Sequence, residues 1–449
     1  MILDEFKRHN LFLNGLEDFR NNDPHLSLLK DLKFVWKADW WKQMNLAAPG
    51  IYILTGGRQI GKSTSAKFLI EHALSNDLFS RDSVFYLSCD QVDDHHNLSR
   101  IVTTFLEDIG KNKFLLIIDE VTFVKEWDRA IKSLADDGSL RNGICILTGS
   151  DSVVLKEASQ RFPGRRGSAD RTDFHIHPLS FHEYLGLVAP HTLNDAATNI
   201  EELYRQFDMF QQCGGYLKAI NDLHAFGEIR KATFLTFEQW IRGDFEKRKK
   251  NPEVLLGVLK MIMETSTTQV TYSSLAHKMG SVVKETFIDY LNLLERMDII
   301  FELQAFDQNT MLGFPKKARK IHFCDPFIME TVARWLVSER RIGQKDLSPI
   351  KAESIVASEC KRRSPSYYLK ADGEIDVILV EGRKFTPVEV KWTNQLRPQD
   401  LKQLSKYKNS VILTKNSIEG RIGEIKAIPL PLFLVKKRLQ SLDTRSELG

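Results

Sequence analysis

Residues 56–63, Gly-Gly-Arg-Gln-Ile-Gly-Lys-Ser, decide the fold of the first part of this chain. They match the phosphate-binding pattern G-x-x-x-x-G-K-[S/T] at every fixed position. An apolar run precedes them at residues 51–54, and a helix-like run follows at residues 63–74. In this setting the backbone N–H groups of a glycine-rich loop close around phosphate oxygens, and the N-terminus of the next helix adds positive partial charge. The sequence therefore predicts a phosphate-binding loop between a strand and a helix.

The side chains of this stretch suit ATP and Mg²⁺. The Lys62 ammonium would reach the β- and γ-phosphates, and the Ser63 hydroxyl would ligate Mg²⁺. The alternative is a chance glycine-rich turn before a helix, and a second matching motif downstream argues against it. The residues expected to contact the nucleotide are Gly56, Gly57, Arg58, Gln59, Ile60, Gly61, Lys62, Ser63 and Thr64.

Apolar runs alternate with amphipathic stretches between residues 51 and 177. This alternation predicts an α/β fold in which helices cover a parallel sheet. Ligands of such sheets bind at the carboxyl ends of the strands. The expected strands are residues 51–55, 84–88, 114–119, 144–148 and 173–177.

Two acidic residues, Asp119 and Glu120, end the third of these strands. A buried apolar strand that delivers an acid suits Mg²⁺ chemistry, and Asp119 would hold the metal through water. Glu120 could polarise the water that attacks the γ-phosphate. The fourth strand ends beside Thr148 and Ser150, and either residue could sense the γ-phosphate or simply form the turn. Ser150 joins the expected nucleotide contacts.

Composition narrows the class of protein. The chain has 449 residues, a net charge of +4, 42% apolar residues and 27% charged residues, as ordinary soluble proteins do. No run of about eighteen apolar residues occurs, so we expect no membrane partner. The N-terminus lacks the basic and apolar regions of a signal peptide, which favours a cytoplasmic location. The cysteines lack metal-type spacing, which argues against disulfides and a zinc site; they are Cys89, Cys145, Cys213, Cys324 and Cys360.

Several segments together resemble the AAA+-type ATPases found in many archaea and bacteria, which carry a C-terminal domain labelled as of unknown function. The resemblance runs over nearly the whole chain, and its ATPase motifs are highly specific. The segments are GGRQIGKS at 56–63, LLIIDE at 115–120 followed by Trp127, ILTGS at 146–150, PGRR at 163–166 and HPLSFHEYL at 177–185.

Two features of this family bear on the site. A Gly-Arg step after the sensor strand can supply an arginine to a neighbouring active site, and here that step is Gly164-Arg165. Such an arginine stabilises charge on the transferring phosphoryl group. The resemblance therefore implies a catalytic Arg165 and a homo-oligomer, while a basic surface loop is the alternative. The family's Gly-Gly-x-Pro signature appears here as Gly-Gly-Tyr-Leu at residues 214–217 and lacks the proline.

The pattern changes between residues 252 and 321, where we expect three helices and then two strands. The helices are residues 254–264, 272–279 and 282–297, and the strands are residues 299–306 and 320–323. This order describes a winged helix, which the resemblance also implies. DNA is the expected partner, through phosphate contacts of Lys316, Lys317 and Arg319 in the wing. A winged helix that binds protein is the alternative.

A second group of residues that suits metal chemistry lies between residues 349 and 415. Glu353 falls on an expected helix, Asp376 on a strand, and Glu389 and Lys391 share a face of the next strand. The set resembles the restriction-endonuclease-like core. That resemblance implies that Asp376 and Glu389 bind Mg²⁺, that Glu353 supports the metal, and that Lys391 assists the attacking water. The alternatives are an ion pair between Glu389 and Lys391, or an inactive scaffold that binds DNA or a partner.

The expected fold is α/β, with five parts along the chain. They are a helical cap (1–48), a P-loop ATPase core (49–190), a helical lid (191–250), a winged-helix-like part (251–325) and a restriction-endonuclease-like part (326–449). The leading hypothesis is a protein that hydrolyses ATP and couples turnover to DNA binding or processing. The alternative is a nucleotide-dependent switch whose C-terminal part docks a protein partner without cleaving DNA. A small-molecule kinase is a third hypothesis.

Overall fold

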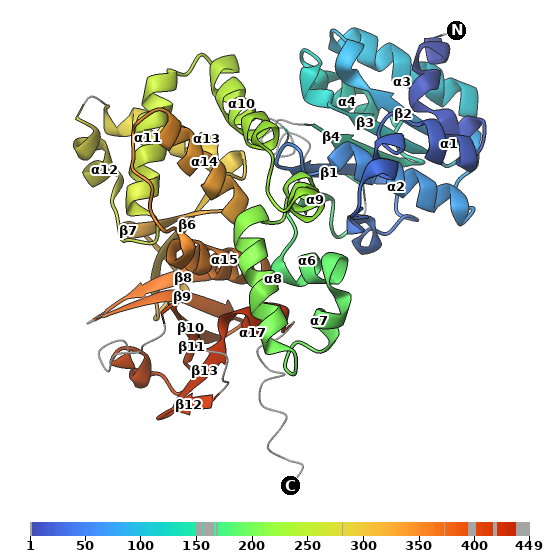
Figure 1. The fold of residues 1–449 in the computed structure, drawn as a ribbon. Coiled ribbons are helices and arrows are strands. Elements are labelled where there is room, and N and C mark those ends of the chain that lie inside the picture. The colour runs from blue at the N-terminus through green and yellow to red at the C-terminus, as the bar shows by residue number, and fades with distance from the viewer. Residues whose placement is uncertain are drawn as a thin grey trace. The chain divides into compact units, whose positions relative to one another are not determined.

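The protein forms two compact units, Met1–His177 and Pro178–Gly449, each drawn in Figure 1. The structure is a computed structural model, and it describes residues 2–149, 155, 166–167, 169–280, 282–371, 373–393, 401–415 and 420–436. The first unit joins the expected cap to the ATPase core and ends at residue 177 rather than 190. The expected lid, winged-helix-like and nuclease-like parts all belong to the second unit. Every helix in the described ranges is too short or too polar to cross a membrane.

A five-stranded parallel sheet forms the centre of the first unit. The strand order is β2-β3-β4-β1-β5, so β1 lies between β4 and β5. The parallel sheet predicted from the alternating pattern is confirmed. The strands are β1 (Gly50–Gly56), β2 (Val84–Ser88), β3 (Leu115–Asp119), β4 (Ile144–Thr148) and β5 (Asp173–Ile176).

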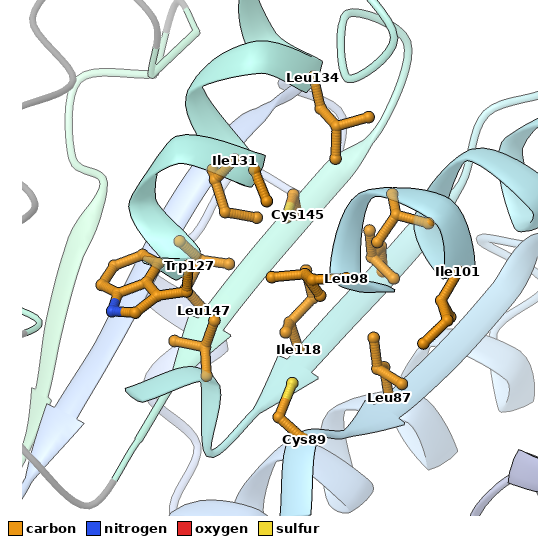
Figure 2. Close-up of a cluster of buried hydrophobic side chains, with 14 of the residues drawn as sticks. Leu87, Cys89, Leu98, Ile101, Ile118, Trp127, Ile131, Leu134, Cys145 and Leu147 are labelled. Carbon is orange, nitrogen blue, oxygen red and sulfur yellow. The ribbon is translucent and has the colours of Figure 1, made fainter. Parts of the chain in front are cut away.

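Helices cover both faces of this sheet. Its central strands are therefore buried along their whole length. On one face, α3 (His95–Ile109) and α4 (Trp127–Asp136) pack against alternate strand residues. Figure 2 shows this cluster, in which Trp127 of α4 lies near Leu147 of β4. On the other face, α2 (Lys62–Ser75) packs against the intervening residues. The strand residues of that second face are Tyr52, Leu54, Val84, Tyr86, Leu115, Ile117, Ile144, Ile146, Phe174 and Ile176.

Although Phe6 packs with the α3 and α4 cluster, most of the N-terminal segment packs on the face that α2 covers. Phe12, Phe19, Trp40 and Trp41 are buried there with residues of β1 and α2. The expected helical cap is thus part of the first unit, and most of its turns are 3-10 rather than α-helical. Its elements are η1 (Ile2–His9), η2 (Leu11–Leu13), α1 (Leu16–Asn22), η3 (Ser27–Asp31) and η4 (Trp40–Gln43). Later 3-10 turns of this unit are η5 (Arg81–Ser83), η6 (Cys89–Gln91) and η7 (Val121–Phe123).

The second unit begins with a helical region, and the segment expected to form a helical lid (191–250) lies within it. Its first helices are α6 (Phe181–Val188), α7 (Pro190–Asn194), α8 (Ile200–Cys213), α9 (Leu217–Phe226) and α10 (Lys231–Lys247). Ser180 begins α6 with a capping box, in which its hydroxyl and the Glu183 carboxylate each accept a backbone N–H of the other residue. The later helices are α11 (Pro252–Thr265), α12 (Tyr272–Met279), α13 (Lys284–Arg296), α14 (Pro326–Ser338), α15 (Ser348–Arg363) and α17 (Leu430–Val435).

A mixed eight-stranded sheet forms the rest of the second unit, in the order β12-β13-β11-β10-β9-β8-β6-β7. The helix α15 packs against several of its strands. The strands are β6 (Ile300–Asp307), β7 (Leu312–Phe323), β8 (Ser366–Lys370), β9 (Glu374–Glu381), β10 (Lys384–Lys391), β11 (Val411–Thr414), β12 (Gly420–Ile422) and β13 (Ile425–Pro429), with a 3-10 turn η8 (Leu404–Lys406) before β11.

The expected order of three helices and a two-stranded hairpin agrees with α11, α12, α13, β6 and β7. Val270 also exchanges both backbone hydrogen bonds with Arg319 on β7, each 2.9 Å long. The hairpin does not belong to a separate domain, however. Ala305 of β6 pairs with Tyr368 of β8, and the Tyr368 hydroxyl donates to Ala318 O at 2.6 Å. These contacts merge the expected winged-helix-like and nuclease-like parts into one sheet.

Candidate functional site

Residues 56–63 run from the last residue of β1 through a loop at 57–61 into the first turn of α2, so the loop lies between a strand and a helix as predicted. Gly56 has a φ of +152°, and a Cβ atom there would lie 2.6 Å from Ile176 O, so only glycine fits. Gly61, with a φ of +91°, directly precedes α2. The Lys62 ammonium donates to Gly56 O at 3.0 Å and to Gly57 O at 2.9 Å. The lysine is therefore buried and anchored to the loop that is expected to hold phosphate.

Asp119 lies at the carboxyl end of β3 and is almost completely buried. Its Oδ1 accepts the Glu120 backbone N–H at 3.1 Å, and its Oδ2 accepts the Tyr86 hydroxyl. Glu120 adopts a left-handed backbone conformation with a φ of 55°, which turns the chain immediately after the strand. Two neighbouring groups thus fix the Asp119 carboxylate, and each oxygen keeps a lone pair for a metal-bound water.

Tyr86 is a site residue that the sequence analysis missed. Burial raises the pKa of its hydroxyl well above the usual value, and the Asp119 carboxylate raises it further, whereas a hydrogen bond with Ser63 lowers it. The phenol therefore stays protonated and contacts both residues that are expected to coordinate Mg²⁺. The only signal in the sequence is a tyrosine within the apolar strand Val84–Ser88.

Thr148 ends β4, the strand between β3 with Asp119 and β1 with the phosphate-binding loop. Its side chain is fully buried, and among the described residues its hydroxyl has no hydrogen-bond partner. Buried hydroxyls are normally paired. The geometry therefore favours Thr148 as the residue that senses a bound phosphate, while Ser150 and Arg165 lie outside the described residues.

Replacing Thr148 with Val should lower kcat for ATP hydrolysis by about 10- to 100-fold, because a hydrogen bond to a charged group contributes about 1.5–3 kcal/mol. The free energy of unfolding should stay unchanged or rise, because the lost hydroxyl has no partner in the described part of the chain. Steady-state kinetics and urea unfolding test both points. Thr55→Val is the matched control for stability: the Thr55 hydroxyl lies 3.2 Å from Phe174 O and 2.8 Å from His175 Nδ1, so this variant should be destabilised. An unchanged kcat in Thr148→Val would contradict the sensing role.

These residues fit ATP with Mg²⁺. The loop begins at the carboxyl end of β1, and Asp119 and Thr148 end β3 and β4. Within the described part of the chain, the Thr148 hydroxyl has no hydrogen-bond partner. No group of three or more His, Cys, Asp or Glu residues within the described ranges could hold a metal ion. Such a group is not needed here, since Mg²⁺ in nucleotide sites takes one or two protein ligands and completes its shell with phosphates and waters.

The Gly-Gly step at residues 214 and 215 has a local role in the second unit. The Gly215 N–H donates to Asp325 Oδ2 at 2.8 Å, and a Cβ on Gly214 would lie 2.0 Å from Asp325 Oδ1. Burial raises the pKa of Asp325 to about 6, although hydrogen bonds from Gly215 and Phe327 oppose this effect. Asp325 also caps α14. The glycines thus allow the chain to approach a buried carboxylate, which explains them without a nucleotide.

The four residues of the second expected metal site lie close together in the second unit. Glu353 comes from α15, Asp376 from β9, and Glu389 with Lys391 from β10. Asp376 N donates to Glu389 Oε2 at 3.3 Å, and Lys391 Nζ lies 2.8 Å from Glu389 Oε1. The predicted shared face of Glu389 and Lys391 is therefore present, as an ion pair.

Lys320 of β7 was not expected among these residues, and it occupies the centre of the acidic group. Its ammonium lies 2.8 Å from Asp376 Oδ1, 3.0 Å from Glu353 Oε1 and 2.5 Å from Glu374 Oε1. The structure thus places a lysine against Asp376 and Glu353, where the sequence analysis expects Mg²⁺. Asp376 and Glu389, the two expected metal ligands, contact Lys320 and Lys391 respectively. Arg319, an expected phosphate contact, is half-buried and pairs with Glu302 at 3.1 Å.

Comparison with known proteins divides the chain into three matched segments. Residues 48–185 match a family described as an AAA domain, and this segment contains the whole loop, Asp119, Glu120 and Thr148. Residues 212–339 and 351–433 match two domains of unknown function, DUF8612 and DUF4143. An uncharacterized protein of Methanocaldococcus jannaschii is 23% identical over 83% of this chain and 82% of its own length. An uncharacterized protein of Haemophilus influenzae is 23% identical over 76% of this chain and 82% of its own length.

Solved structures with partial similarity are also found. A Walker-type ATPase of Pyrococcus abyssi is 14% identical, with a TM-score of 0.42, over 63% of this chain and 91% of that chain. The ORC2 protein of Aeropyrum pernix is 12% identical, with a TM-score of 0.38, over 72% of this chain and 95% of that chain.

Proposed function

We propose that this protein binds ATP with Mg²⁺ and hydrolyses it in its first unit. The observation that carries the proposal is the convergence of the loop at residues 56–63, buried Asp119 and the unpaired Thr148 hydroxyl at the carboxyl ends of adjacent strands. The match of residues 48–185 to an AAA domain supports the same activity. A water-activating acid directly after Asp119 favours hydrolysis over phosphate transfer to a small molecule.

Each residue has one role in the proposed reaction. The loop amides and Lys62 hold the β- and γ-phosphates, and Ser63 and Asp119 hold Mg²⁺, which neutralises charge on the phosphates when it is bound. Tyr86 keeps the Asp119 carboxylate in place. Glu120 accepts a proton from the attacking water, and Thr148 donates to the γ-phosphate as charge develops.

Nucleotide binding can be tested with Lys62→Ala. This variant should bind ATP at least about tenfold more weakly, because Lys62 contributes a charge-assisted hydrogen bond to phosphate. Lys42→Ala removes an exposed lysine of the same unit and is the matched control. Isothermal titration with a non-hydrolysable ATP analogue measures both proteins. Equal affinity in the two variants would contradict the proposed phosphate site.

DNA is the ligand to which we propose that turnover responds, through the second unit. The proposal is supported by the order α11-α12-α13-β6-β7 and by the exposed Lys316 and Lys317 on the β6–β7 hairpin. Phosphate contacts by such lysines are independent of DNA sequence and weaken as salt increases. The α13 surface is less basic, since exposed Glu285 accompanies Lys284 and Asp289 pairs with Lys250.

The same ATPase assay with and without duplex DNA tests this coupling. Turnover and gel retardation should respond to DNA, and both responses should weaken in Lys316→Ala/Lys317→Ala. The matched control is Lys111→Ala/Lys113→Ala, which removes two exposed lysines of the first unit. If DNA changes neither property in the unaltered protein, the alternative function gains support: a nucleotide-dependent switch that docks a protein. The arginine in trans and the homo-oligomer remain predictions that rest on Arg165.

A further inference from the structure

The acidic group of the second unit already contains a cation of its own. Lys320 is completely buried, and carboxylate oxygens of Glu353, Glu374 and Asp376 lie within 3.0 Å of its ammonium. An ammonium has three N–H donors and no acceptor. Three carboxylates therefore match the donor capacity of Lys320 in full.

Other contacts hold the carboxylates in this arrangement. Asp376 Oδ2 accepts the Val390 N–H at 2.9 Å, so its Oδ1 faces Lys320. The Gln269 side-chain amide donates to Glu374 Oε2, so the other oxygen of that group faces the ammonium. The lysine itself is fixed because β7 pairs with β6, where Lys320 lies opposite Leu303. The arrangement draws on four elements, and no loop movement is needed to form it.

Burial and neighbouring charges shift the pKa values of the residues in this group. Burial lowers the pKa of Lys320, but the carboxylates of Asp376, Glu353 and Glu374 outweigh it and raise the pKa well above its usual value. Burial acts to raise the pKa of Asp376, but the charge and hydrogen bond of Lys320, the Val390 N–H and the Lys391 charge together lower it. Burial and the Asp376 charge raise the pKa of both Glu353 and Glu389 to about 8.

A simple structural ion pair does not account for this composition. One buried lysine needs one carboxylate for charge balance, whereas three carboxylates point at Lys320 and a fourth, Glu389, contacts the Asp376 backbone. Carboxylates are the donors that a hard divalent cation takes, but among the described residues no such group is arranged to hold a metal ion. Here the Lys320 ammonium lies in the central position, against Glu353, Glu374 and Asp376.

We propose that Lys320 occupies the cation position of this group and thereby excludes a divalent metal, as an autoinhibitory contact within the second unit. The unaltered protein then binds no Mg²⁺ or Mn²⁺ through Asp376 and cleaves no phosphodiester bond there. Any role of this region with DNA is binding without cleavage. Removing the ammonium leaves ionisable carboxylates around a space that a divalent cation can fill.

The test is Mn²⁺ binding by the full chain, measured by electron paramagnetic resonance of free Mn²⁺. Lys320→Met should gain one Mn²⁺ site, and the site should be lost in Lys320→Met/Asp376→Asn. The unaltered protein and Asp376→Asn alone should bind Mn²⁺ equally, since neither has the site. An Asp376-dependent Mn²⁺ site in the unaltered protein would overturn the proposal, as would Mn²⁺-dependent plasmid nicking that Asp376→Asn abolishes.

A stability measurement covers the case in which Lys320→Met folds poorly without metal. Refolding from urea with Mn²⁺ should restore Lys320→Met and should raise its Tm by several degrees more than that of the unaltered protein. The control is Lys320→Met/Glu353→Gln/Asp376→Asn, whose acids are neutralised and whose Tm should not respond to Mn²⁺. If Lys320→Met stays unfolded in Mn²⁺ while this control folds, Lys320 is only a structural counter-ion and the proposal fails.

Discussion

Glu120→Gln is expected to lower kcat for ATP hydrolysis by about 10²- to 10⁴-fold, the usual contribution of a general base. ATP binding should persist, because Glu120 is assigned to the attacking water rather than to the phosphates. The left-handed turn at Glu120, with a φ of 55°, places this side chain directly after Asp119. The substitution keeps the size and hydrogen-bonding shape of the side chain and removes only its basicity. Phosphate release and the affinity for an ATP analogue measure the two effects separately.

Glu126→Gln is the matched control for this prediction. Glu126 also has a left-handed backbone, with a φ of 56°. It directly precedes α4, and its carboxylate forms an ion pair of 2.9 Å with Arg129. Its substitution should change kcat less than about twofold, since exposed ion pairs contribute about 0.2–1 kcal/mol and this one is not placed in the site. Unchanged turnover in Glu120→Gln would remove the proposed base. Equal losses in both variants would indicate a general effect on folding.

Asp23→Ala is expected to lower the free energy of unfolding by about 3–5 kcal/mol, because it leaves a buried lysine without its counter-ion. Asp23 and Lys67 are both fully buried, and Lys67 Nζ lies 2.9 Å from Asp23 Oδ2. The same ammonium donates to His9 O at 2.6 Å and lies 3.5 Å from the centre of the Tyr86 ring. Burial lowers the pKa of Lys67, while the Asp23 carboxylate opposes this effect. Urea unfolding followed by circular dichroism measures the loss.

Two further proteins make this second prediction specific. Glu17→Ala removes an exposed acid from α1, the helix that Asp23 follows, and should change stability by less than about 0.5 kcal/mol. Asp23→Ala/Lys67→Met should recover part of the loss, because it removes the uncompensated charge and leaves an apolar side chain. A double variant less stable than Asp23→Ala would show that Lys67 acts through its other contacts. Because Lys67 packs on Tyr86, which holds Asp119, the variants also test how the N-terminal segment supports the nucleotide site.

The nucleotide site was predictable because its signals are local. The stretch at residues 56–63 requires glycine at position 56, where β5 lies close, and at position 61, directly before α2. Both glycines are fixed positions of the short sequence pattern. Asp119 follows directly from an apolar strand that ends in an acid. Three helices and two strands between residues 252 and 323 of the second unit were likewise readable from apolar periodicity, whereas α14 and β8 were not expected. These features depend on neighbours a few residues away, so the sequence alone identifies them.

The contacts that decide the chemistry around these residues are long-range. Tyr86 and Asp119 lie 33 positions apart, and Lys320 and Asp376 lie 56 positions apart. The residues next to Tyr86 and Lys320 in the sequence do not indicate which distant side chains these two residues contact. Pairing of β6 with β8 is what joins the hairpin to the acidic strands. The glycine–lysine pattern therefore predicts the nucleotide loop, and periodicity predicts much of the order of elements. The cation at the acidic group follows from strand pairing, since only packing brings a buried charge to its partners.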